Sequence, residues 1–189
     1  MSSPDLPRLN VTSLSQYVRY NNCDRYLRFR LRPNEERKLR QRWSITIQPL
    51  TPLLREAGLD FEQTVETAVE NLGEEVVRLG NAAPLSDTLA WLHVARAPVV
   101  LLQAPLEARL GNYQVNGIAD LIRLWRDESG GLHLFVADIK SSVKEKMEHR
   151  LQVALYVQIL KEMVAAEDLS FASINGRIIH AGDPEFLET

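Results

Sequence analysis

Two acidic residues and a lysine lie in apolar segments of the sequence, where a charged side chain is costly. Residues 113–125 are apolar on both alternating faces, which predicts a central buried strand that carries Asp120. The next apolar run, 132–141, places Asp138 and Lys140 on one face near its end. A buried carboxylate is unfavourable unless a cation or hydrogen bonds compensate for its lost hydration. We therefore take Asp120, Asp138 and Lys140 as candidate functional residues.

The turn between these two strands can bring the acids together. The glycine-containing residues 127–131 predict a hairpin, so Asp120 and Asp138 would lie on neighbouring strands near one end of the sheet. Two close carboxylates repel each other, and the pKa of one rises unless a divalent cation bridges them. Oxygen ligands of this kind suit Mg²⁺ or Mn²⁺. Two structural interpretations stay open: an ion pair between Asp138 and Lys140, and a turn cap or an ion pair with Arg123 for Asp120.

The elements before these strands are predicted to be helical. One helix is predicted over residues 58–79, after Pro49 and Pro52 break the preceding pattern. Its apolar side chains recur at three- and four-residue steps and should face a core: Phe61, Val65, Ala68, Leu72 and Val76. A second helix is predicted to begin with Ser86 as its N-cap and to end before Pro98.

Three strands and a further helix follow. The β-rich runs 99–110, 113–125 and 132–141 have short connections, which predicts an antiparallel meander. Residues 145–167 predict an amphipathic helix with four apolar side chains directed inward: Leu151, Leu155, Ile159 and Met163. Residues 169–180 predict either a last strand or a hairpin at the Asn-Gly pair near their middle. This order predicts an α/β or α+β fold class, with a central mixed sheet flanked by helices.

The composition is that of an ordinary globular domain, and we expect one domain over residues 1–189. About 45% of the residues are apolar and 25% are charged. No apolar run approaches the roughly 20 residues that span a bilayer, and residues 1–10 lack the apolar core of a secretion signal, so we expect a cytoplasmic protein without membrane contact. The single cysteine, Cys23, excludes an internal disulfide, a zinc site of several thiolates and a four-cysteine iron–sulfur cluster. The ending after residue 180 shows no obvious stop, so a fragment of a longer protein stays an alternative.

Residues 11–48 form an arginine-rich amino-terminal segment that is predicted to be helical. Between residues 19 and 42, nine basic residues occur with three acidic ones, although the whole chain has a net charge of −3. Aromatic residues alternate with these arginines, a pattern that can place stacking rings beside guanidiniums that bind phosphate. Arg25 and Arg28 are the candidate contacts. The alternative, a solvated helix with aromatic anchors, stays open.

Three ordered motifs resemble those of the PD-(D/E)XK nuclease superfamily, and within it the RecB-like branch. They are GIAD at residues 117–120, VADIK at 136–140 and QVALY at 152–156. The piece GLDFE at 58–62 resembles the first-helix motif of the family, with Glu62 where many RecB-like members have histidine. The branch includes CRISPR-associated exonucleases and nuclease domains attached to helicases. The resemblance spans roughly residues 11–180.

The resemblance implies a restriction-endonuclease-like fold and a metal-dependent DNA nuclease. Mg²⁺ or Mn²⁺ would be held by Asp120, Asp138, the Ile139 carbonyl and Glu62. Lys140 would orient the attacking water or stabilise the charge that develops on the phosphate. Gln152 and Tyr156 would contact DNA or brace the lysine. Lys144 and Lys146 would contact DNA phosphates.

The same resemblance favours an exonuclease that acts on single strands or ends in DNA repair or defence. DNA would be the substrate, and a helicase or other subunits would be partners. Iron–sulfur members of the branch carry cluster cysteines that this chain lacks, so no cluster is expected. The four histidines show no ligand spacing and are interpreted as structural or exposed. Two alternatives stay open: a weakly active or inactive DNA-binding or scaffold module of a larger complex, and a protein that binds a small phosphorylated ligand, although no glycine-rich phosphate loop is present.

Overall fold

The fold is described from a computed structural model, which covers residues 6–46 and 51–182 in describable detail. Six strands and six helices are found there, and Pro49 lies outside this part of the chain. The elements in chain order are β1 (Arg8–Asn10), α1 (Val11–Arg19), α2 (Asp24–Leu31), α3 (Pro33–Arg42), α4 (Pro52–Glu70), β2 (Glu75–Arg78), α5 (Leu85–Val94), β3 (Val99–Leu110), β4 (Tyr113–Arg126), β5 (Leu132–Lys140), α6 (Met147–Ala166) and β6 (Phe171–His180).

The strands form one mixed sheet with the order β2-β3-β4-β5-β6, and β1 pairs with β4 beside this path. The predicted antiparallel meander of β3, β4 and β5 is confirmed, and β4 is central. The outer strands β2 and β6 run parallel to β3 and β5. The predicted fold class, a mixed sheet flanked by helices, is therefore confirmed.

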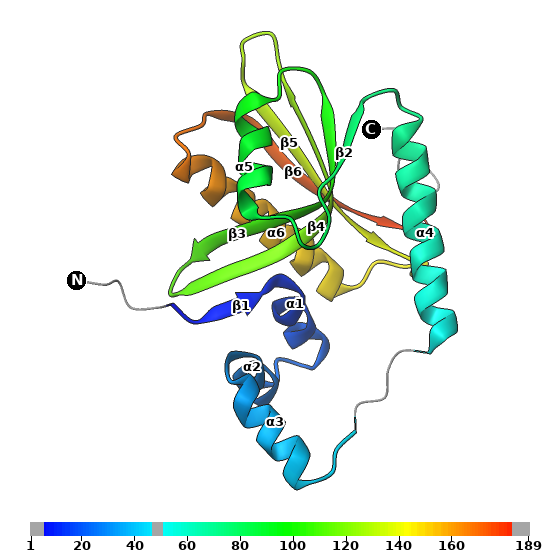
Figure 1. Cartoon of the computed structure of the whole chain (residues 1–189), viewed down its shortest axis with the longest axis vertical. Helices are drawn as coiled ribbons and strands as arrows, with labels where there is room; N and C mark the ends of the chain where they lie inside the picture. The colour runs from blue at the N-terminus through cyan, green and yellow to red at the C-terminus, as the bar shows by residue number, and fades with distance from the viewer. Residues whose placement is uncertain (1–5, 47–50, 183–189) are drawn as a thin grey trace, which may run out of the picture.

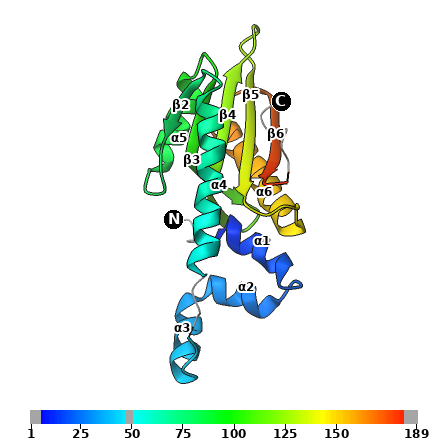
Figure 2. The ribbon, with the colours of Figure 1, turned by 90° about the vertical axis from the view of Figure 1, so that its right-hand side faces the viewer.

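Helices cover both faces of this sheet, and each face has its own apolar core (Figures 1 and 2). One core joins α1, α5 and α6 to the sheet through side chains such as Val11, Leu92 and Ile159. The other core joins α4 to the opposite face through Val65 and Val69. In both views α2 and α3 extend beyond the end of the sheet, with α2 next to α1 and α3 farther from it. No helix in the described part of the chain is long and apolar enough to cross a membrane.

The predicted helix over 58–79 is wrong at both ends. Helix α4 begins six residues earlier, because Pro52 occupies its first position, where a proline suits the helix. It ends at Glu70, and the chain turns through Gly73, which has a φ of 76°. The following residues form β2 instead, because Val76 and Val77 pair with β3, a tertiary contact that local periodicity does not reveal.

Three smaller expectations also need correction. Helix α5 has Pro84 as its N-cap residue, so Ser86 lies inside the helix. Helix α6 buries Ile159 and Met163 as predicted, but near its start Gln152 and Tyr156 are buried instead of Leu151 and Leu155, which are half-buried. The alternative of a hairpin at 175–176 is wrong, because β6 continues through both residues.

The feature that matters most for the site is an interruption in the sheet between β3 and β4. In a regular strand, successive side chains face opposite sides of the sheet, and both strands depart from this rule here, through a phase change in the alternation. In β3, Leu101 and Leu102 contact opposite cores, so Ala104 should share a core with Leu102. It contacts the core of Leu101 instead. In β4, Ala119 and Ile122 share one core although three positions separate them. The ladder pairs the residues on either side of the interruption but leaves out residues 103 and 120, which would otherwise be partners.

Candidate active site

The interruption sets the position of Asp120. The strands β4 and β5 pair as far as Leu121 and Ala137, so Asp120 and Asp138 follow at the point where these strands stop pairing. The Asp120 carboxylate accepts a hydrogen bond of 2.7 Å from the main-chain N–H of Ile139. The structure thus brings together the two acids that the sequence placed on neighbouring strands. The expectation of strict alternation around Asp120 is wrong, because the phase change occurs at this residue.

Asp138 is completely buried and has one cationic partner. The Nζ atom of Lys140 lies 2.8 Å from Oδ1 and 2.8 Å from Oδ2 of Asp138, and hydrogen-bond geometry is met only at Oδ1. Oδ1 also accepts a hydrogen bond of 2.7 Å from Nε2 of Gln152. Within the described part of the chain, Oδ2 has no hydrogen-bond partner. Oδ2 thus has only the ion-pair contact with Lys140, and a metal ion bound there would take the place of this contact.

The electrostatics of the two acids follow from this burial. Desolvation raises the pKa of Asp138, and repulsion from Asp120 raises it further, while Lys140 opposes both effects. Desolvation also raises the pKa of Asp120, again with Lys140 acting in the opposite direction. The ammonium of Lys140 thus offsets only part of the unfavourable burial, and a second cation between the acids would be bound favourably.

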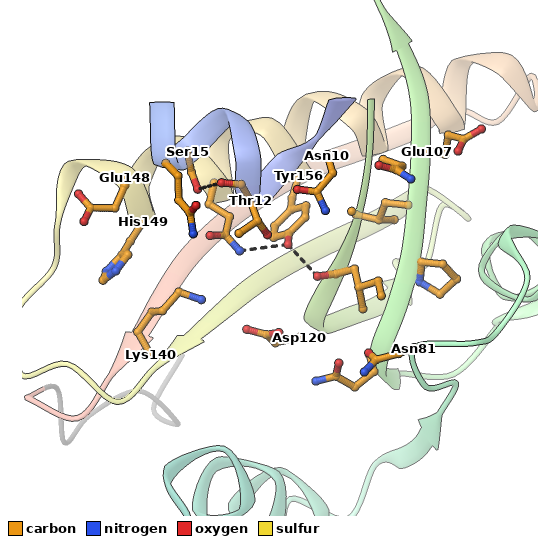
Figure 3. A pocket seen from close by; sticks show the side chains of 18 of the residues that line it. Asn10, Thr12, Ser15, Asn81, Glu107, Asp120, Lys140, Glu148, His149 and Tyr156 are labelled. Carbon is orange, nitrogen blue, oxygen red and sulfur yellow. Dashed lines mark hydrogen bonds between the residues drawn. The ribbon is translucent and has the colours of Figure 1, made fainter. Parts of the chain in front are cut away.

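Helix α6 supplies a hydrogen-bonded brace for the acids (Figure 3). Gln152 donates to Asp138 and also to the hydroxyl of Tyr156, at 3.1 Å. That hydroxyl donates in turn to the carbonyl of Ile118, at 2.7 Å, on the strand that carries Asp120. Both side chains are at least nine-tenths buried. Gln152 and Tyr156 thus brace Asp138 and the strand of Asp120, not the lysine as predicted, and contact with DNA stays a prediction.

The brace predicts a measurable effect of a single hydroxyl. We expect Tyr156→Phe to destabilise the protein by about 1–3 kcal/mol, because the Ile118 carbonyl loses its donor and Gln152 loses an acceptor in a buried setting. We also expect lower activity, since the position of Asp120 relative to Asp138 depends on this link. Urea unfolding measures the first effect. Tyr113→Phe, at the exposed start of β4, is the control, and equal stability of the two variants would contradict the brace.

A cavity of about 710 Å³ opens beside these residues, and of the remaining candidates only Lys146 lines it. It is lined by Asp120, Lys140, Lys146 and Gln152, and by several residues of β1 and α1 between Asn10 and Arg19. The cavity also contains a residue that sequence analysis interpreted as structural or exposed. His149 is buried, its Nδ1 has no hydrogen-bond partner in the described part of the chain, and burial lowers the pKa of its ring. The sequence held one sign of this position, because His149 lies three residues before Gln152 and therefore on the same face of the helix.

Asp138 and Ile139 lie beside this cavity without lining it, and four other predicted site residues lie farther from it. Glu62 of α4 lines a neighbouring pocket and is close enough to Asp120 for repulsion to add to burial in raising the pKa of Glu62. Lys144 lies exposed in the loop before α6. Arg25 and Arg28 border a different pocket on α2 and α3, where Arg28 forms a two-pronged ion pair with Glu35. The roles predicted for these four residues stay predictions.

The donor set fits a divalent cation, with ligands still to be completed by other groups. Among residues 6–46 and 51–182, no cluster of three or more His, Cys, Asp or Glu side chains is placed to hold a metal ion. The two aspartates supply hard oxygen ligands, and the buried Oδ2 of Asp138 lacks a hydrogen bond. Main-chain carbonyls, water or substrate oxygens are the ordinary further ligands of Mg²⁺, which keeps several waters in most protein sites.

A mixed sheet flanked by helices, with two acids and a lysine at the divergence of two central strands, defines a restriction-endonuclease-like α/β protein. The chain belongs to the PD-(D/E)XK nuclease superfamily, whose family model matches residues 16–180. Members of this superfamily are generally nucleases and typically use divalent metal ions.

Two further comparisons were made. The solved structure described as "Crystal structure of SSO0001" has 16% sequence identity and a TM-score of 0.28, and the match covers 84% of this chain. The match covers 60% of that protein, so this chain is the shorter of the two. A search of curated proteins found no match.

Proposed function

We propose that this protein is a metal-dependent deoxyribonuclease that hydrolyses phosphodiester bonds in single strands or at strand ends. The observation that carries the proposal is the buried Asp138, whose two carboxylate oxygens lie 2.8 Å from Nζ of Lys140. A solvated surface ion pair would need neither this burial nor the brace from α6. The nearby Asp120 adds a second carboxylate, which an ordinary structural ion pair does not require.

Each group has a definite role in the proposed reaction. Asp120 and Asp138 would hold Mg²⁺ or Mn²⁺, with the Ile139 carbonyl and Glu62 as further candidate ligands. A divalent ion there supplies neutralisation of the phosphate and a lower pKa for the attacking water. Lys140 would orient that water and stabilise the charge that develops on the phosphate. Its side chain is about a quarter exposed and lines the cavity, so it can contact both the buried acid and a ligand.

The shape of the site favours a single strand as the substrate. Asp120 lines a concave cavity that is walled on one side by the start of α1 and on another by α6 (Figure 3), and Asp138 is buried beneath Lys140 beside it. A flexible single strand can place a phosphate in such a cavity more readily than a stiff duplex can. Lys146 and Arg19 line the cavity and are suited to contact neighbouring phosphates.

Within the superfamily we assign the chain to the RecB-like branch, because residues 152–156 resemble its Gln-x-x-x-Tyr helix motif and both of these side chains connect to the acids. A role in DNA repair or defence, with a helicase or other subunits as partners, follows from that assignment. The arginine-rich segment would then guide the strand, with Arg25 and Arg28 far enough along it to contact DNA outside the cavity.

The test is cleavage of end-labelled DNA by the purified chain. Linear and circular single strands and duplexes are incubated with Mn²⁺, Mg²⁺ or EDTA. We expect cleavage of linear single strands with either metal and none with EDTA. Cleavage of circles would exclude a requirement for ends. Absence of cleavage together with retained DNA binding would favour the alternative of an inactive module in a larger complex, and absence of both would contradict the proposal.

A further inference from the structure

Two side-chain amides beside Asp120 have no hydrogen bond within the described part of the chain. Six residues with such amides line the cavity, and three of them are engaged: Asn10 caps α1, Gln16 accepts from Tyr26, and Gln152 braces the acids. The other three are not engaged in this way: Asn81, in the loop between β2 and α5, Gln103 of β3, and Asn116, which lies four residues before Asp120 where β4 pairs with β1. Figure 3 shows Asn81 on one side of Asp120 and Lys140 on the other.

The backbone holds Gln103 next to Asp120 at some cost. Gln103 occupies the ladder position that would pair with Asp120, and its φ of 55° lies in the left-handed region that a glutamine rarely adopts. Such a conformation persists only where the surrounding structure imposes it, and it is enriched at binding sites. The phase change of β3 therefore directs an amide, rather than an apolar side chain, to the wall beside the acid.

The charges around these amides select a neutral ligand group. Asn81 and Gln103 also line the adjacent pocket, whose other walls carry Glu62, Glu66 and Glu70. Arg78, the cation there, forms an ion pair with Glu66. An anionic phosphate is disfavoured on this side, whereas the cations that line the cavity are Lys140, Lys146 and Arg19. The acids Asp120, Glu107 and Glu148 also line the cavity, so the two amides are uncharged hydrogen-bonding groups beside an acid rather than beside the cations.

We propose that Asn81 and Gln103 bind the edge of a nucleobase next to the phosphate that is cleaved, so that the rate of cleavage depends on base identity. An amide presents a donor and an acceptor on adjacent atoms, which matches base edges, and Asn or Gln pairs best with adenine. The inference rests on the proposed nuclease function and names the part of the substrate that this wall recognises.

The experiment compares cleavage of single strands made only of dA, dC or dT, in Mn²⁺, by the parent protein and two variants. Asn81→Ala removes one amide, and Gln103→Gly removes the other while allowing the positive φ. We expect the parent to cleave dA strands more efficiently than dT strands, by on the order of tenfold in kcat/KM. Each variant should bring the two values closer together, mainly by weakening KM for dA.

Two controls separate this inference from the proposed function. Asn112→Ala, at the turn between β3 and β4 outside the cavity, should keep the base preference of the parent. Stabilisation by Mn²⁺, followed by thermal unfolding, should be unchanged in both variants. Active variants with the base preference of the parent would overturn the inference alone. Lost Mn²⁺ stabilisation would also overturn it, because the amides would then belong to the metal site. A parent that cleaves no strand would contradict the proposed function and the inference with it.

Discussion

Asp138→Asn is expected to reduce metal-dependent cleavage by about a thousandfold, because the substitution removes one negative charge from the proposed metal site. The amide has nearly the volume of the carboxylate, and its oxygen can still accept the hydrogen bond from Gln152. The fold should therefore survive, which a circular dichroism spectrum and a cooperative unfolding transition would show. Single-turnover cleavage of a labelled single strand in Mn²⁺ measures the effect.

Asp168→Asn is a suitable control for this substitution. Asp168 is exposed after α6 and has a φ of 53°, a conformation that asparagine tolerates well. Its variant should cleave as fast as the parent. Cleavage by Asp138→Asn at more than a tenth of the parent rate would contradict the assignment of this acid.

Lys140→Met is expected to reduce cleavage about as much as Asp138→Asn does. The two variants should differ in how strongly Mn²⁺ stabilises them against unfolding. Without the ammonium, two repelling carboxylates stay buried, and we expect a loss of about 1–3 kcal/mol in EDTA, reduced from the usual value for a buried pair because Lys140 is partly exposed. Mn²⁺ should then stabilise this variant more than it stabilises the parent. In Asp138→Asn, Mn²⁺ should stabilise less. Urea unfolding with EDTA or Mn²⁺ measures the difference.

The control for the lysine is Lys161→Met, on the exposed face of α6. It tests whether replacing any lysine with methionine changes stability in EDTA, and little change is expected. If Mn²⁺ stabilised Lys140→Met less than the parent, the lysine would not be opposing the charge of the acids, and its proposed place in the site would be wrong.

Much of the sheet could be predicted because apolar runs, alternation and short turns within the sequence determine its three central strands. The strand bounds of β3 follow from an apolar run between Pro98 and a Gly-Asn turn, and the prediction over 99–110 is confirmed. The face shared by Leu134, Val136 and Asp138 also follows from simple alternation, since β5 is regular. Short turns then made the antiparallel order of three strands nearly unavoidable.

The features that could not be predicted depend on contacts between distant segments. Strand β2 forms only because β3 offers a parallel edge, so the apolar steps around Val76 looked helical. Helix α6 buries Gln152 and Tyr156 because Asp138 and the Ile118 carbonyl supply partners, and without those partners an apolar face centred on Leu155 is the better prediction. Asn81 likewise comes close to Asp120 only through the folded path of the loop between β2 and α5, which the sequence pattern does not reveal.

The paired phase change at residues 103 and 120 also restricts how this chain can evolve. The apolar side chains on either side of it match the same core only because both strands shift together. Deleting Gln103 alone would keep Ala104 and Leu106 on the face that they occupy but would leave Asp120 as a bulge in one strand, whereas deleting both residues would produce a regular sheet. Such a regular sheet would gain stability and lose Asp120, so the proposed site depends on a local irregularity that a more stable sheet would not contain.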